Sequence, residues 1–338
     1  MRNLFLITAL LLLGSLAVDA QQYKISGRIP FPGEGGWDYL AVDSANRRLY
    51  VSHSTQVEVV DLDSEKPVAK ITGMKRIHGI AVANDFNRGY ISDGGDDVVV
   101  IFDLKSDAVL QKVPAGKNPD GILYDPYSKR VFAFNGRSND ATAIDAASGK
   151  VAGTVALDGK PEFPVSDGKG NVYVNIEDKS EIAQLDPQTL KVKKTWSLSP
   201  CEEPSGLAID LEARRLFSVC SNNKMAVVNA DSGQVMATVA IGNGPDAAGY
   251  DPARKLVFSS NGEGTLTVVR QDSPDKYTVL ENAATERSAR TMSLDTKTHK
   301  IYLSAAQLGA APEATADNPH PRPKIIPDSF HVLVLSPL

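Results

Sequence analysis

The sequence predicts an all-β protein, a seven-bladed β-propeller built from four-stranded antiparallel blades. One unit recurs seven times, and each unit begins with a short apolar run that ends at a fixed position. Those end positions, 40 to 44 residues apart, are Asp43, Ala83, Asp125, Asp167, Asp210, Asp251 and Asp295. A period in the forties with several short strands per unit is typical of propeller blades. A closed ring of seven blades would use the chain from residue 21 to residue 338 as one domain.

Residues 1–20 form a separate segment with the pattern of a secretory signal peptide. Arg2 precedes an apolar stretch that is too short to span a bilayer, and small residues lead to Ala20. We expect cleavage after Ala20, a periplasmic or secreted location and no membrane span in the mature chain. An uncleaved anchor is the alternative.

Residues 23–29 are predicted to be the strand that closes the ring. The seventh unit supplies three strands and then the chain stops, so its outer strand is missing. A strand from the N-terminus that pairs with the C-terminal blade would leave few unpaired edges. A loose N-terminal tail is the alternative.

Within each blade the strands follow a common pattern, which the second unit shows clearly. Residues 77–83 are mostly apolar, as expected of an innermost strand, and residues 89–93 and 98–103 follow as second and third strands. Asn and Asp occupy the turns between them, because these residues tolerate left-handed backbone angles.

The second strands carry a family resemblance. Tyr50-Val51-Ser52-His53 resembles the Tyr-Val-Thr-Asn motif of the YVTN-repeat β-propellers of the YncE type, and looser copies stand in the other units. Third strands that end in an acidic residue and a small-residue turn, such as Asp145 to Gly149, strengthen the resemblance. It implies an extracytoplasmic propeller and only weakly indicates an activity; single-stranded nucleic-acid binding is one possibility that it suggests. The net charge of −5 and the lack of Lys/Arg runs disfavour nucleic acid as a partner.

Cys201 and Cys220 lie in one unit, just before its first strand and at the end of its second. Both should fall near the same end of a hairpin, so a structural disulfide is predicted for an exported chain. A thiol metal site or two free thiols are the alternatives.

A set of ionic residues is predicted at the mouth of the central channel. Counting back five residues from each strand end gives one position per blade: Asp38, His78, Asp120, Glu162, Ser205, Asp246 and Arg290. Such a set could bind a small molecule, a saccharide, a protein or a cation, or supply a general acid and base. The alternative is a solvated polar wall without chemistry.

Two neighbouring residues extend the predicted ligand-binding set. Trp37 could stack on a sugar ring, or simply pack between blades. His53 and His78 of adjacent blades could, with Asp38 or Asp93, hold a divalent metal, although no short ligand spacing supports this. Catalytic residues cannot be assigned from the sequence.

Residues 306–329 interrupt the last blade between its second and third strands. The segment contains five prolines among charged residues, and so long an insertion is typical of a functional or disordered loop. It is expected either to cover the channel mouth or to pack over the blade edges.

The leading hypothesis for the function is a binding or interaction protein. The second hypothesis is a lactone hydrolase or lyase that uses the same face, with a divalent metal as a possible cofactor.

Overall fold

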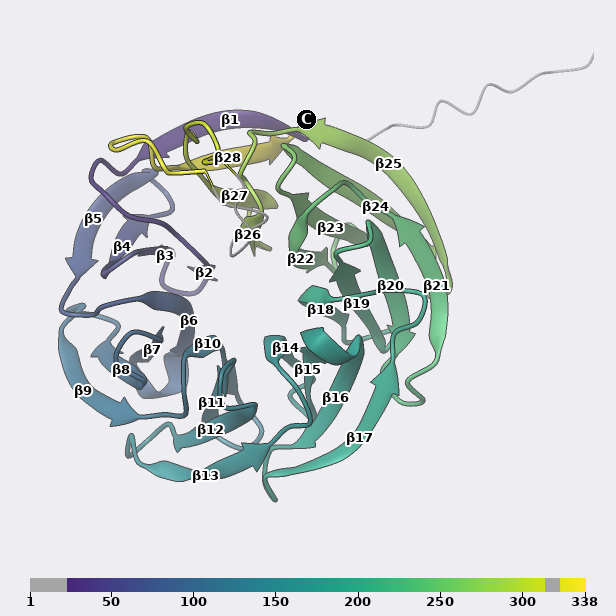
Figure 1. Cartoon of the computed structure of the whole chain (residues 1–338), viewed down its shortest axis with the longest axis horizontal. Helices are drawn as coiled ribbons and strands as arrows, with labels where there is room; N and C mark the ends of the chain where they lie inside the picture. The colour runs from purple at the N-terminus through teal and green to yellow at the C-terminus, as the bar shows by residue number, and fades with distance from the viewer. Residues whose placement is uncertain (1–22, 314–322) are drawn as a thin grey trace, which may run out of the picture.

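The computed structural model describes residues 23–313 and 323–338, and these form seven four-stranded antiparallel sheets arranged around a central channel (Figure 1). The predicted fold is therefore confirmed. The expected signal peptide lies outside the described residues. Among the described residues, no helix has the length and apolar character needed to cross a membrane.

Blades 1 to 6 each run from an innermost to an outermost strand in chain order. Blade 1 consists of β2 (Leu40–Asp43), β3 (Arg48–His53), β4 (Gln56–Asp61) and β5 (Lys66–Ile71). Blade 2 consists of β6 (Ile77–Ala83), β7 (Arg88–Asp93), β8 (Val98–Asp103) and β9 (Val109–Pro114). Blade 3 consists of β10 (Pro119–Asp125), β11 (Arg130–Asn135), β12 (Asp140–Asp145) and β13 (Val151–Ala156).

Blades 4 to 6 follow the same order. Blade 4 consists of β14 (Pro161–Ser166), β15 (Val172–Ile176), β16 (Glu181–Asp186) and β17 (Lys191–Ser197). Blade 5 consists of β18 (Pro204–Asp210), β19 (Arg215–Cys220), β20 (Lys224–Asn229) and β21 (Val235–Ala240). Blade 6 consists of β22 (Pro245–Asp251), β23 (Leu256–Asn261), β24 (Thr265–Ser273) and β25 (Lys276–Ala284). Short 3-10 turns at Asn84–Phe86 and Glu177–Lys179 complete the elements of the ring.

Blade 7 is assembled from both ends of the described chain. Its strands are β26 (Thr291–Asp295), β27 (Lys300–Ala305), β28 (His331–Pro337) and β1 (Tyr23–Pro30). β1 pairs antiparallel with β28 from Tyr23 opposite Pro337 to Pro30 opposite His331. The predicted closing strand is confirmed: β1 is the outermost strand of blade 7 and covers the edge of β28 that would otherwise be unpaired.

The aromatic residues of the second strands hold neighbouring blades together. Tyr50, Tyr90, Tyr173 and Tyr302 are fully buried. The Tyr90 hydroxyl donates to the carbonyl of Ala146 at 2.8 Å, and the Tyr173 hydroxyl donates to that of Ala230 at 3.0 Å. Each bond reaches the next blade, so Tyr90 and Tyr173 bury apolar area while their hydroxyl groups stay paired.

The strand-end aspartates of the repeat have a structural role at the far end of the inner strands. Asp43 accepts the backbone N–H groups of Ala45 and Asn46, and Asp125 accepts that of Ser128. These bonds close the turn into the second strand. Blade 2 has Ala83 at this position and instead turns through the 3-10 segment Asn84–Phe86.

The predicted disulfide is present. Cys201 and Cys220 are joined, with Cα atoms 5.7 Å apart, and they connect the loop before β18 to the end of β19. No free cysteine remains.

Candidate functional site

The seven mouth positions, which we call the mouth ring, lie where the inner strands begin. Five of them occupy the second position of β6, β10, β14, β18 and β22, while Asp38 and Arg290 come just before β2 and β26. The pairing register is irregular at the start of each of those five strands, for example between Ile77 and Ile80. Bulges of this kind redirect side chains, and here they fall at the channel entrance.

Polar residues of the second strands fix the backbone of the mouth ring. Ser92 donates to the carbonyl of Asp120 at 2.5 Å, and the Asn175 amide donates to that of Ser205 at 2.8 Å. Ser260 likewise donates to the carbonyl of Arg290. Since each bond crosses to the next blade, neighbouring mouth positions are held in a fixed relation to one another.

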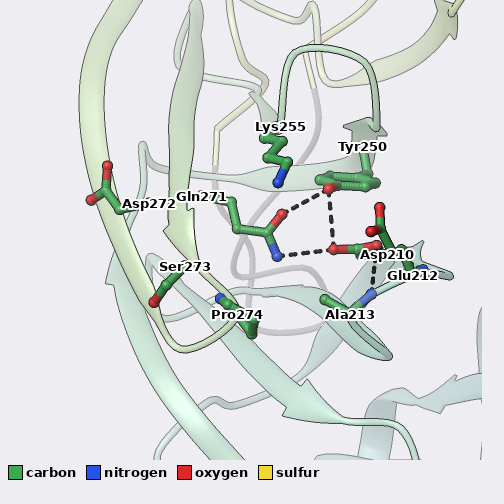
Figure 2. A pocket seen from close by; sticks show the side chains of 9 residues that line it. All are labelled: Asp210, Glu212, Ala213, Tyr250, Lys255, Gln271, Asp272, Ser273 and Pro274. Carbon is green, nitrogen blue, oxygen red and sulfur yellow. Dashed lines mark hydrogen bonds between the residues drawn. The ribbon is translucent and has the colours of Figure 1, made fainter.

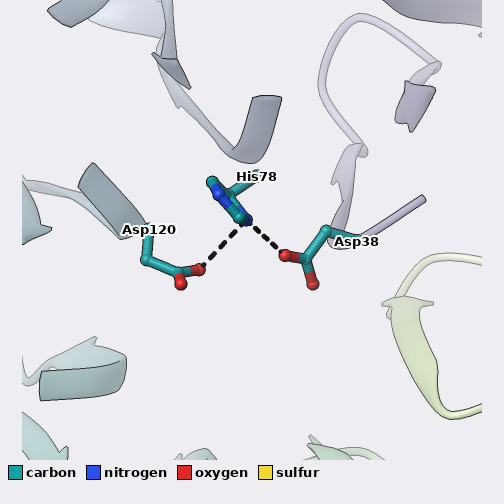
Figure 3. Close-up of side chains that lie close together, drawn as sticks. All are labelled: Asp38, His78 and Asp120. Carbon is teal, nitrogen blue, oxygen red and sulfur yellow. Dashed lines mark hydrogen bonds and ion pairs between the residues drawn. The ribbon is translucent and has the colours of Figure 1, made fainter. Parts of the chain in front are cut away.

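Asp38, His78 and Asp120 form the most compact group in the mouth ring (Figure 3). His78 Nδ1 lies 2.6 Å from Asp38 Oδ2 and 3.6 Å from Asp120 Oδ1, so one imidazole stands between carboxylates of two flanking blades. His78 is 5% exposed. Burial disfavours its charged form, but the hydrogen bond to Asp38 and the charge of Asp120 outweigh that effect and raise the pKa of His78.

Two carboxyl groups of the ring, Asp120 and Glu162, have raised pKa values. Burial, opposed by His78 but assisted by the charge of Asp38, raises the pKa of Asp120 to about 6. Burial and Asp120 raise the pKa of Glu162 to about 8, although Lys160 Nζ lies 2.6 Å from Glu162 Oε1 and opposes the shift. These groups can therefore exchange protons near neutral pH.

The other side of the ring is cationic. Arg290 Nε lies 3.2 Å from Asp246 Oδ2, and the charge of Asp246 raises the pKa of the guanidinium. The mouth thus presents an acidic side at blades 1 to 4 and an arginine at blade 7.

Two aromatic side chains fill the channel below the ring. Tyr39 of blade 1 and Phe163 of blade 4 have ring centroids 5.3 Å apart. They stand directly after mouth residues, at a position that holds Gly79, Gly121 and Gly206 in other blades. Burial and the charges of Asp120, Glu162, Asp38 and Asp246 raise the pKa of Tyr39 well above its usual value, as expected of a phenol that lies beneath the carboxylates of the ring.

A pocket of about 420 Å³ opens beside this group, and we call it the mouth pocket. Asp38 and His78 border it on one side, and Arg76 and Arg290 contribute guanidinium groups. Its remaining lining residues are Gly36, Trp37, Ser54, Lys75 and Ile77. It has the size and the mixture of charges expected of a site for a small polar molecule.

Not every predicted site residue contacts the group formed by Asp38, His78 and Asp120. The Ser205 hydroxyl donates to the carbonyl of Pro245 at 3.2 Å, which is a structural bond between blades 5 and 6. His53 lies away from His78: its Nδ1 is 3.1 Å from Glu58 Oε1, and its ring packs against Phe330. Asp93 accepts backbone N–H groups of Lys75 and Arg76. The structure therefore does not bring His53 or Asp93 together with His78 as metal ligands.

Trp37 lies between the ring and the insertion. Its indole stacks on Phe330 with centroids 5.5 Å apart and planes inclined by 12°, so one face packs between blades, while the residue also borders the mouth pocket. Both roles expected of it are thus compatible with its position.

The described part of the insertion, residues 306–313 and 323–329, forms an arm of two antiparallel segments joined by a bridge between Leu308 and Ile325. Gly309 N–H donates to the Lys324 carbonyl at 2.8 Å, and Ile326 N–H donates to that of Gln307 at 2.9 Å. Phe330 anchors its base against Phe31 and Trp37. Figure 1 shows the arm, in yellow, beside blades 7 and 1, to one side of the channel centre.

A second pocket, of about 290 Å³, lies at the other end of the inner strands (Figure 2). The Gln271 amide donates to Asp210, one of the strand-end aspartates, at 2.9 Å, and the Tyr250 hydroxyl lies 2.7 Å from Gln271 Oε1 and 3.1 Å from Asp210 Oδ2, so its one proton is available to either acceptor. Because these polar groups satisfy one another, we interpret this network as a structural connection between blades 5 and 6.

The side chains of the mouth ring are suited to two kinds of chemistry, cation binding and proton transfer. One atom from each of Asp38, His78 and Asp120 lies within 4.8 Å of the others, a nitrogen and two oxygens that suit a divalent cation. The same three groups could instead hold and transfer a proton.

Sequence reasoning missed Tyr39, Phe163 and Lys160. The first two could have been found by comparing the residue after each mouth position, because aromatics there replace glycine. Lys160 stands two residues before its mouth residue, where other blades hold Arg76, Asn118 or Glu203, so the repeat does not indicate its contacts with Glu162 and Glu177.

Comparison with known proteins adds a distant likeness. No protein-family model matches the chain. It is 24% identical over 141 residues to the uncharacterized protein YncE of Salmonella typhi and, equally, to that of Salmonella typhimurium. The match covers 38% of this chain and only 40% of the length of each relative. With seven blades closed by β1, the chain is a YncE-like β-propeller, as the sequence resemblance predicts.

Proposed function

We propose that this propeller binds a small polar ligand at the mouth ring, with a hydrogen-bond donor or cation of the ligand against Asp38 and Asp120 and an acceptor or anion against Arg290. The observation that carries the proposal is the position of His78 between two carboxylates at the edge of a 420 Å³ pocket that also exposes Arg290. A purely structural ion pair would not need a third ionisable group, nor a pocket beside it.

The test is a thermal-shift screen of amines, sugars and amino acids, followed by titration calorimetry of any hit. Asp120→Asn should weaken binding of the hit by at least about tenfold, because a charge-assisted contact is lost. Asp158→Asn is the matched control, since Asp158 is exposed on the loop before β14. Equal affinity of the two variants would contradict the proposal.

A second candidate is a propeller enzyme of the hydrolase or lyase type that uses a divalent cation. The close approach of Asp38, His78 and Asp120 favours it, since these residues could hold the cation, and a bound cation would supply Lewis-acid chemistry. Glu162, with its pKa raised to about 8, would carry or deliver a proton. Elemental analysis of the purified protein, with Asp38→Asn as comparison, tests it: no stoichiometric metal and no thermal shift with Ca²⁺, Mn²⁺ or Zn²⁺ would count against it.

We further propose that the protein works outside the cytoplasm. The Cys201–Cys220 disulfide is of a kind that persists in oxidising compartments, and residues 1–20 have the pattern of a cleaved signal peptide. N-terminal sequencing of protein recovered from a cell-envelope or culture fraction should begin at Gln21; an intact N-terminus in the cytoplasmic fraction would contradict this.

A further inference from the structure

A third pocket, of about 370 Å³, adjoins the mouth pocket and has a different character. We call it the arm pocket; it is lined by Gly36, Trp37, Gly262, Arg287, Ser288, Arg290, Leu308, Pro323 and Ile325. It shares the lining residues Gly36, Trp37 and Arg290 with the mouth pocket, so the two pockets lie side by side. One ligand could therefore extend from one to the other.

The charges of the arm pocket are of one sign. Arg287 and Arg290 line it, and no carboxylate does. Of the nearby acids, Glu286 is already paired with Arg28 at 2.8 Å and with His331 at 3.0 Å, and Asp246 is paired with Arg290. Arg287 has no ion-pair partner among the described residues, which is a notable local excess of positive charge in a chain of net charge −5.

The rest of the wall is apolar and partly aromatic. Leu308, Pro323 and Ile325 come from the two segments of the arm, and Trp37 from the loop before β2. Phe330 covers one face of the indole, so the pocket borders the remainder of the ring system. Ile325 also packs on the cluster of blades 1 and 7, which fixes this wall in place.

From this pairing of guanidinium groups with an apolar wall, we infer that the arm pocket binds the carboxylate and the apolar body of a small amphipathic acid. A guanidinium presents a planar pair of donors that matches a carboxylate, and the apolar body would remove Trp37 and Leu308 from water. The inference deepens the proposed function, because it names the class of ligand for the end of the site nearest the arm.

The experiment uses 3-phenylpropionate as the probe, with its neutral amide and the corresponding amine as matched comparisons. Titration calorimetry on the chain from residue 21 should show that the carboxylate binds and that the amide and amine bind at least about tenfold more weakly. Arg287→Gln and Leu308→Ser should each weaken carboxylate binding by a similar factor without lowering the melting temperature. Arg137→Gln, an exposed arginine of blade 3, should leave it unchanged.

Two results would overturn the inference. The first is equal binding of the three probes, or no binding of the carboxylate. The second is carboxylate binding that Arg287→Gln leaves intact and Arg76→Gln abolishes; that outcome would place the anion in the mouth pocket, which Arg76 lines and the arm pocket does not share, and would keep the proposed function. If the ligands found in the screen bind to Asp120→Asn as tightly as to the original protein, the proposed function is contradicted. The effect of Arg287→Gln on carboxylate binding then decides the arm pocket by itself.

Discussion

Tyr39 and Phe163 belong to blades 1 and 4, yet their rings meet inside the channel with centroids 5.3 Å apart and planes inclined by 58°. No backbone hydrogen bond joins these two blades, which are not neighbours in the ring. The contact therefore reaches across the channel beside the mouth ring and joins two blades that are not adjacent.

The first prediction concerns the energy of that contact. A double-mutant cycle with Tyr39→Ala and Phe163→Ala should give a coupling of about 0.5–1.5 kcal/mol in the free energy of unfolding, as expected for an aromatic pair. Urea unfolding of the four proteins measures it. A coupling indistinguishable from zero would mean that the two rings do not support each other.

The second prediction concerns His78. Asp38→Asn removes a charged hydrogen-bond acceptor 2.6 Å from Nδ1, so the raised pKa of His78 should fall. Nuclear magnetic resonance titration of the imidazole measures the change, and Asp158→Asn serves as the control. An unchanged titration would show that Asp38 is not the partner that holds the proton.

The third prediction is a pH dependence of stability that originates in Glu162. Its folded-state pKa is about 8 against an ordinary 4.5, so between these values the folded protein binds more protons than the unfolded chain. The free energy of unfolding contributed by this group therefore falls as pH rises through that window. Asp167 and Asp295 have lowered pKa values and act in the opposite sense, but only at lower pH, below their ordinary value of 3.8.

Glu162→Gln should remove most of the fall in the free energy of unfolding that this carboxyl group causes as the pH rises. The melting temperature of the variant, relative to the original protein, should increase steadily from pH 4.5 to pH 8. A constant difference across that range would contradict the assignment of the titration to Glu162.

The fourth prediction concerns the close approach of inner strands. A Cβ at Gly121 would lie 2.4 Å from the Glu162 carbonyl oxygen, and backbone cannot yield as a side chain can. Gly121→Ala should cost about 1–3 kcal/mol of stability and displace the mouth ring at blade 4. Gly136→Ala is the control, because its nearest atom is 3.6 Å away. Chemical denaturation of both variants provides the comparison.

The fifth prediction concerns the disulfide. It closes a loop with a sequence separation of 19, so Cys201→Ser with Cys220→Ser should lower stability by about 3 kcal/mol in the chain-entropy model. The reduced original protein should behave similarly in denaturant. Full stability of the double variant would show that the bridge has no structural role.

The sequence was a good guide to every feature that repeats. Spacing alone predicts seven blades, and counting back from Asp125 or Asp251 locates Asp120 and Asp246 at the mouth. Ring closure follows because blade 7 lacks one strand, and the Cys201–Cys220 pairing follows from its hairpin.

What the sequence could not supply are contacts between non-equivalent positions. The choice of Asp38 and Asp120 as the partners of His78, and the meeting of Tyr39 with Phe163, depend on side-chain reach across the ring. The arm has no period, so nothing in its composition places Ile325 and Pro323 beside Arg290.

The pairing of Tyr23 with Pro337 has a consequence for biosynthesis. Tyr23 belongs to β1, the first strand of the ring in chain order, but its partner Pro337 lies in β28, which follows all the strands of the other six blades. Six blades can form in succession while the seventh waits, and during that interval the circle stays open with a strand edge exposed to other chains. Truncated products, which lack the C-terminal partner, should therefore be the forms that aggregate or recruit chaperones.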